Sequence, residues 1–175
     1  GWSMSTAIKT TVAQRGENVL RLIAQPILQA EFATQGLNQL VSNMHDTMNE
    51  RLGVGIAAPQ IYVSKRVIIV ASRQNLRYPD APEMDAIVMI NPDILETGGE
   101  NIWGDEGCLS VPDQRGLVLR SEAVHVRYQT LTGEWVEQYF QGFPARIIQH
   151  EIDHLNGILF VDHVEKTQKA SVISD

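Results

Sequence analysis

Apolar residues recur at three- and four-residue spacing between residues 34 and 51 of the chain. They are Leu37, Leu40, Val41, Met44 and Met48. This spacing places them on one face and is typical of an amphipathic helix that covers a core. Thr34 suits the N-cap of that helix, and Gly53 follows its last apolar residue. The first pattern therefore predicts an N-terminal amphipathic helix.

The middle of the chain changes to a strand-like pattern. Residues 66–72 and 86–90 are short runs rich in Val and Ile, which predicts two buried strands. Residues 118–129 alternate between apolar and polar positions, so one face of this strand is expected to be buried. That face carries Val124, Val126 and Tyr128. Gly133 offers a tight turn into residues 135–140, which predicts an antiparallel hairpin.

A second helix is predicted over residues 144–157. Pro144 suits its first position, and Gly157 suits a left-handed residue at its C-terminal end. Together these patterns predict an α+β fold, with mostly antiparallel strands around this central helix and the amphipathic helix before them.

Composition favours one ordinary domain over residues 4–175. The chain has 175 residues, of which 43% are hydrophobic and 20% are charged. Residues 1–3 precede Met4 and are typical of a cloning remnant. The formal charge is −7, and the basic residues are scattered, so no direct nucleic-acid partner is expected. No apolar run approaches the roughly 20 residues that cross a bilayer, so no membrane association is expected either.

The strongest chemical signal is the pentapeptide His150-Glu151-Ile152-Asp153-His154 in the second predicted helix. Two histidines four residues apart project from the same helix face, so their rings can bind one cation. Glu151 lies beside the first histidine and can act as a general acid/base on a metal-bound water. This pattern predicts a metal-dependent hydrolase that uses one divalent ion.

The third ligand separates several functions that share this pentapeptide, because a catalytic zinc-type site normally has three protein ligands and one open position. A metzincin-like peptidase needs a histidine where this chain has Phe160, and a thermolysin-like peptidase needs a downstream glutamate, for which Glu165 is the sole candidate. A zincin-like metallopeptidase thus remains a weakened alternative. A non-catalytic metal-binding module, with a closed four-ligand site, is another.

Three segments together resemble the signature motifs of the peptide deformylases, in that family's order. They are residues 53–60 (GVGIAAPQ), 106–110 (EGCLS) and 149–155 (QHEIDHL). Cys108 is the only cysteine in the sequence, so no intramolecular disulfide can form, which favours a cytoplasmic location. A lone cysteine is commonly a small buried hydrophobic residue. The resemblance implies instead that Cys108 is the third metal ligand. A thiolate and two neutral imidazoles neutralise only one of the cation's two charges, so the ion stays electrophilic.

The resemblance also implies a reaction. Metal-bound water attacks the N-terminal formyl group of a formyl-methionyl polypeptide, and formate is released. Glu151 would transfer the proton, and Gln60 with the Leu109 N–H would stabilise the oxyanion. The family's usual native metal is Fe²⁺, with Zn²⁺, Ni²⁺ and Co²⁺ as alternatives for the same ligands. The implied partners are N-formyl-methionyl nascent polypeptides, with a transient ribosome contact possible in this family.

Substrate contacts are expected at positions that match the family. The backbone of Val54, Gly55 and Gly107 would pair with an extended peptide. An apolar pocket for the methionine side chain would then be lined by two residues just before the first histidine. These are Phe143 and Ile147.

Three further charged residues lie in or near these motifs. Arg115 and Glu106 match charged family positions, and we expect them to pair with each other. Arg146 is expected either to contact substrate or to be a solvated helix residue.

Overall fold

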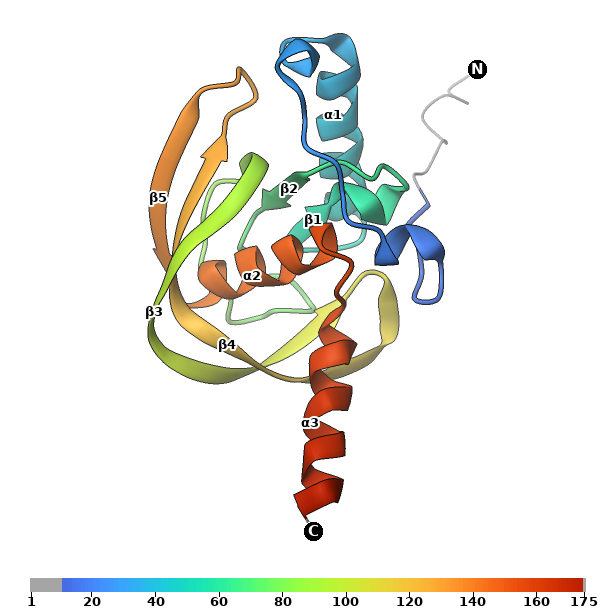
Figure 1. Cartoon of the computed structure of the whole chain (residues 1–175), viewed down its shortest axis with the longest axis vertical. Helices are drawn as coiled ribbons and strands as arrows, with labels where there is room; N and C mark the ends of the chain where they lie inside the picture. Colours follow the sequence, from blue (N-terminus) through green and yellow to red (C-terminus); the bar gives the residue numbers. More distant parts are fainter. Residues whose placement is uncertain (1–10, 175) are drawn as a thin grey trace.

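The computed structural model describes residues 11–174, and the side chains as far as residue 168. The proposed cloning remnant at residues 1–3 lies outside this range. Within it, one antiparallel sheet has the strand order β1-β2-β3-β4-β5. The strands are β1 (Gly55–Ala57), β2 (Val67–Val70), β3 (Ile87–Cys108), β4 (Val111–Gln129) and β5 (Trp135–Gln141). The α-helices are α1 (Gln35–Glu50), α2 (Phe143–Leu155) and α3 (Phe160–Ser174). Figure 1 shows α2 in the middle of the molecule, with the curved sheet around it. The α+β class is therefore confirmed.

The two predicted helices form close to the expected positions. Thr34 caps α1, because its hydroxyl oxygen accepts a hydrogen bond from the Leu37 N–H at 3.3 Å. Four of the five residues of its apolar stripe are buried, and Leu40 is partly buried. At the other helix, Gly157 has φ +76°, the left-handed conformation that favours glycine after a helix end.

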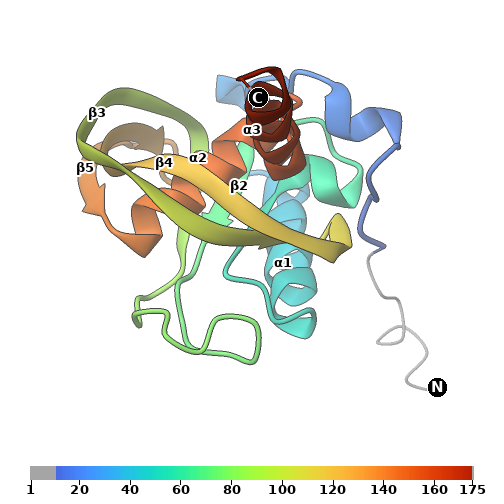
Figure 2. The same ribbon diagram turned by 90° about the horizontal axis from the view of Figure 1, so that it is seen from below.

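The strands β3 and β4 are longer than their sequence patterns predict. They pair from Ile90↔Gln129 to Cys108↔Val111, with register shifts that bend the ribbon at several points. Figure 2 shows this hairpin as a long twisted ribbon. Its two-residue turn, Leu109 and Ser110, carries the end of β3 back toward α2.

The sequence patterns predicted two helices, and the structure adds a third, because α3 follows α2 after a short connection. Its first residue, Phe160, is buried, and Val164 packs over Gly116 of β4 so closely that a Cβ there would lie 2.7 Å from a valine methyl. Arg21, in the 3₁₀ helix η2 (Asn18–Arg21), binds Asp162 of α3 through two hydrogen bonds of 2.7 and 3.0 Å. The N-terminal segment therefore holds the start of α3.

The buried apolar residues fall into three clusters around these elements. The largest lies between α2 and the sheet and includes Ile148 and Leu155. The second lies between α1 and strands β1 and β2, and the third surrounds Cys108 and the start of α3. The helix α2 thus has packed elements on its sides, which fixes the orientation of its polar residues. None of the helices in the described range is long and apolar enough to span a bilayer.

Candidate metal centre

The helix α2 presents both predicted histidines toward the interior. His150 is 8% exposed and His154 is 1% exposed, and their ring centroids are 5.1 Å apart. Apolar residues of the same helix, such as Ile148, anchor it in the core on the neighbouring side. The four-residue spacing therefore brings two imidazoles together in a buried place, as the sequence predicted.

Cys108 reaches the same point from the end of β3. Its Sγ lies 3.3 Å from His154 Nε2, and the ligand atoms of Cys108, His150 and His154 all lie within 4.8 Å of one another. The backbone is positioned by the tight turn that joins Cys108 to Val111 and by a register shift just before it. The three predicted ligands therefore converge, although the cysteine and the first histidine are 42 positions apart in the sequence.

The arrangement of donor atoms fits a divalent metal ion. His150 Nδ1 lies 2.9 Å from Glu106 Oε1, so this nitrogen carries a proton and the other nitrogen can bind a cation. One thiolate and two imidazole nitrogens form a ligand set that zinc, iron(II), nickel and cobalt accept. No fourth His, Cys, Asp or Glu joins this group among the residues that the structure describes. A four-coordinate ion held by these three residues would therefore keep one position for water or substrate.

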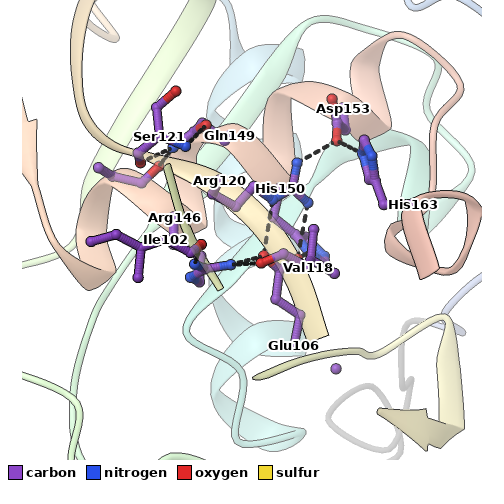
Figure 3. Close-up of polar contacts among 12 residues, drawn as sticks. Ile102, Glu106, Val118, Arg120, Ser121, Arg146, Gln149, His150, Asp153 and His163 are labelled. Atoms are coloured by element: carbon purple, nitrogen blue, oxygen red, sulfur yellow. Dashed lines mark hydrogen bonds and ion pairs between the residues drawn. The ribbon is translucent and has the colours of Figure 1, made fainter. Parts of the chain in front are cut away.

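The charge network behind His150 differs from the expected one (Figure 3). The expected Arg115–Glu106 pair is wrong, because Arg115 bonds to Asp105 at 2.6 Å. Glu106 instead binds Arg120 at 2.9 Å and Arg146 at 2.7 Å. Burial alone would raise the pKa of the Glu106 carboxyl. Arg120 and His150 lower this pKa more strongly than burial raises it, so the net pKa is well below its usual value. Glu106 is therefore ionised and keeps the His150 ring in one orientation.

Ionic interactions also act on the ligands themselves. Burial raises the pKa of the Cys108 thiol, but the adjacent His154 and His150 rings outweigh it, and the net pKa is well below the usual range. Burial lowers the pKa of His150, while the Cys108 thiolate and Glu106 raise it more strongly. The sulfur is thus held as a thiolate, which is the form that binds metals.

Glu151 follows His150 on α2 and is buried beside β1. Its Oε1 atom has no hydrogen-bond partner among the residues that the structure describes, and a Cβ on Gly55 would lie 2.7 Å from its Oε2. Burial is the main cause that raises the pKa of this carboxyl, to about 6. A buried carboxyl with a free oxygen is suited to exchange a proton with a molecule in the adjoining cleft.

Gln60 is placed by the 3₁₀ helix η4 (Ala58–Ile61), directly after β1. The Ala57 N–H donates to its side-chain oxygen at 2.9 Å, so its amide nitrogen faces the hairpin turn. That nitrogen donates to Ser110 Oγ at 3.1 Å and lies 3.6 Å from Cys108 Sγ. The predicted oxyanion donor is therefore oriented toward the metal ligands.

One cleft joins these groups to the surface. All the sequence-predicted substrate positions line it, together with Gln60, Cys108, Leu109, His150 and Glu151. Those substrate positions are Val54, Gly55, Gly107, Phe143 and Ile147. The sequence analysis missed Arg77 and Tyr78, which also line it from the loop between β2 and β3. Tyr78 packs its ring 5.3 Å from that of Phe143, and only this long-range contact could have revealed it.

Arg146, which lies in the first turn of α2, is not a solvated residue. Its side chain is 11% exposed and binds Glu106 together with the backbone oxygens of Ile102 and Val118. The solvated alternative is therefore wrong, and the residue belongs to the network behind the ligands.

Comparison with known proteins assigns the whole arrangement to one family. Residues 9–170 match the family model described as polypeptide deformylase. "Peptide deformylase 2" from Nostoc sp. is 47% identical over 88% of this chain and 85% of its own length. A Met-Ala-Ser-bound class I type b peptide deformylase from Acinetobacter baumannii is 64% identical, with a TM-score of 0.87 over 89% of this chain and 98% of that one. Peptide deformylase from Thermotoga maritima is 35% identical, with a TM-score of 0.78 over 89% and 97% of the two chains. From its three motifs, its fold and its converging ligands, this chain belongs to the polypeptide deformylase family, class I type b.

Proposed function

We propose that this deformylase releases formate from the N-terminus of formyl-methionyl polypeptides, with one metal ion held by Cys108, His150 and His154. The observation that carries the proposal is their convergence beside the free Oε1 atom of Glu151, at the base of a cleft. A linear formamide needs both an electrophilic centre and a proton carrier to be hydrolysed, and in this proposal the metal ion and Glu151 supply the two.

The bound metal would supply a Lewis acid that acidifies water and polarises the formyl oxygen. Fe²⁺ is our proposal for the native ion, as the family resemblance implies, and Zn²⁺, Ni²⁺ and Co²⁺ suit the same ligands. Iron beside a thiolate should make the enzyme sensitive to oxygen. The ligand role also requires reduced Cys108, which fits our proposal of a cytoplasmic location.

Glu151 takes a proton from the attacking water in this proposal and delivers it to the departing amine. Its burial and its free oxygen support that role. The Gln60 amide nitrogen and the Leu109 N–H donate to the substrate oxygen as negative charge develops on it. Gln60 can do so by exchanging its bond to Ser110, because its own oxygen is already fixed by Ala57.

The substrate backbone is proposed to lie as an added strand between β1 and the end of β3. β1 is the edge strand of the sheet, and Gly55 lines the cleft together with Gly107. Val54 lines it too, and its oxygen already accepts a hydrogen bond from the Ala71 N–H at 2.8 Å, which leaves its N–H as the group to pair with a peptide. Phe143 and Ile147 would then contact the methionine side chain. The A. baumannii relative was solved with Met-Ala-Ser, which supports a peptide with an N-terminal methionine. A transient ribosome contact, which the family resemblance implies, stays a prediction.

The alternative functions have less support. Phe160, at the position of the third metzincin histidine, is buried with its ring 6.1 Å from that of His150, and Cys108 provides the third ligand instead. A closed structural site would need a fourth protein donor, and none joins the cluster in the described part of the chain.

Formate release from formyl-Met-Ala tests the proposal, with bound metal quantified in each preparation. Glu151→Gln should lower kcat by about 10²–10⁴-fold while the metal content stays unchanged, because the amide cannot carry the proton. Glu96→Gln, an exposed change on β3, is the matched control and should leave kcat unaltered. Cleavage of an unblocked polypeptide without formate release would instead support a metallopeptidase.

A further inference from the structure

The metal ligands come from two separate elements, so other contacts must fix the position of one element relative to the other. Cys108 lies at the end of β3, whereas His150 and His154 lie on α2. Their ligand atoms must stay within bonding distance of one point, and small displacements weaken a metal site. The contacts that join α2 to the β3–β4 hairpin therefore affect the site even where they touch no ligand.

Arg146 makes such a junction from the first turn of α2. Its Nη2 donates to the Ile102 oxygen of β3 at 2.7 Å, and its Nη1 donates to the Val118 oxygen of β4 at 2.9 Å. Nη1 also donates to Glu106 Oε2 at 2.7 Å. One guanidinium thus binds both strands of the hairpin and a carboxylate, an arrangement that its rigid fork of donors allows.

The same carboxylate binds the first histidine ligand. Arg146 precedes His150 by four residues, so both side chains leave the same face of α2, and His150 Nδ1 binds the other oxygen of Glu106 at 2.9 Å. Figure 3 shows Arg146 and His150 on either side of Glu106. Arg120 completes the set from β4 and is 6% exposed.

A glycine of β3 provides the space for this guanidinium. A Cβ on Gly104 would lie 2.6 Å from Arg146 Cζ and 2.7 Å from both Nε and Nη2. Those are the closest atoms to it, and a Cβ atom essentially never approaches a non-bonded heavy atom within 3.0 Å. The guanidinium is tied by three hydrogen bonds, so it cannot move aside without losing some of them. Gly104 is therefore needed because Arg146 is present.

We propose that Arg146, placed over Gly104, is a positioning residue for the metal site. It fixes His150 through Glu106, and it fixes Cys108 by tying the hairpin to α2. This inference rests on the proposed metal ligation and deepens it, because it names the contact that sets the distance between the sulfur and the imidazoles.

The two residues can be tested as a pair by measuring Co²⁺ affinity against a competing chelator. The Co²⁺–thiolate absorption band reports whether Cys108 is bound. Arg146→Gln and Gly104→Ala should each weaken Co²⁺ binding by about 10–100-fold, the usual effect of losing a residue that supports a ligand. Arg146→Lys should fall between wild type and Arg146→Gln, because one ammonium cannot reach both strands and the carboxylate.

The double variant Gly104→Ala/Arg146→Gln gives the sharpest result. Once the guanidinium is gone, the added methyl group meets no obstacle, so the double variant should bind Co²⁺ no more weakly than Arg146→Gln alone. Gly98→Ala is the matched control on β3, since its Cβ would meet only the Ala123 Cβ at 3.9 Å, and it should bind as wild type does. Thermal unfolding of the metal-free variants verifies that each is folded.

Two results would overturn the inference. In the first, the single losses multiply in the double variant, which means that the two residues act independently. In the second, folded Arg146→Gln binds Co²⁺ as tightly as wild type does and with the same absorption band, so that no positioning role remains. If wild type itself shows no Co²⁺–thiolate band, the proposed metal ligation fails together with the inference.

Discussion

The helix α2 and the hairpin β3–β4 supply the ligands of one site in different ways. On α2, the distance between His150 and His154 follows from helix geometry, so the sequence spacing alone predicts it. On the hairpin, Cys108 reaches the site only after a 22-residue strand that is bent by several register shifts. The relative position of the two histidines is thus fixed within α2. The position of the Cys108 sulfur depends instead on the long-range pairing of β3 with β4 and on contacts such as those of Arg146.

Removal of one ligand from either element should produce the largest effect. Cys108→Ala and His154→Ala are each expected to abolish formate release and to weaken metal binding by more than the roughly 10–100-fold typical of a supporting residue. Competition with a chelator measures the affinity. If Cys108→Ala binds the metal with unchanged affinity, Cys108 of the β3–β4 hairpin is not a metal ligand.

Gln60→Ala should lower kcat by about 10²–10³-fold while the metal stays bound, because one oxyanion donor is lost. The change also leaves the buried Ala57 N–H without its partner, so a lower Tm is expected. Ser110→Ala is the matched variant, since it removes a partner of the amide but keeps the amide itself. Equal losses of kcat in the two variants would indicate a structural role for Gln60.

Gly55→Ala tests the contact between β1 and α2. The new Cβ would lie 2.7 Å from Glu151 Oε2 and from an Ile147 methyl group, so the carboxylate must shift. A displacement of about 1 Å at a reacting group can reduce the rate by as much as roughly 10²-fold, and steady-state kinetics would measure it. Gly36→Ala on α1 serves as control, because its Cβ would meet only Thr34 Oγ1 at 3.9 Å. Unaltered kinetics in Gly55→Ala would contradict the geometry.

The smallest effect is expected at the contact that holds the start of α3. Burial raises the pKa of Asp162, but the Arg21 hydrogen bonds and the Leu159 N–H lower it more, so the net value is below 3.8. A carboxyl with a lowered pKa in the folded state contributes stability above pH 3.8 and loses it as the pH falls through the folded value. Asp162→Asn should therefore reduce the free energy of unfolding at pH 7 by less than about 1 kcal/mol, because the pair is partly exposed. Denaturant unfolding at a series of pH values should show this difference shrinking below pH 3.8, and a difference that is constant with pH would count against the ion pair.

The sequence predicted the parts of the molecule that depend on local spacing. The apolar stripe of α1, the alternation in β4 and the paired histidines of α2 all lie where the patterns place them. The outer half of β3 escaped prediction because its residues are exposed and include Gly98 and Gly99, so backbone pairing with β4 holds the strand without an apolar pattern. The helix α3 escaped because its apolar periodicity is weak.

Side-chain pairings far apart in sequence were also beyond prediction. Arg115, Arg120 and Arg146 are all plausible partners for Glu106 in the sequence, and only the register of β3 with β4 and the direction of α2 decide among them. The register places Arg120 on the carboxylate and turns Arg115 toward Asp105, and the direction of α2 brings Arg146 to the same carboxylate. The role of Cys108 was predicted by family resemblance and not by spacing, for the same reason.

X-ray absorption of the Zn²⁺-loaded protein tests the central claim most directly, because it identifies the atoms bound to the metal. Ligation by Cys108, His150 and His154 predicts one sulfur at about 2.3 Å, two imidazole nitrogens at about 2.0–2.1 Å and one further light atom from solvent. The chain has one cysteine, so the sulfur signal can come from Cys108 alone. A metal shell without sulfur, or one closed by a third imidazole, would contradict the account.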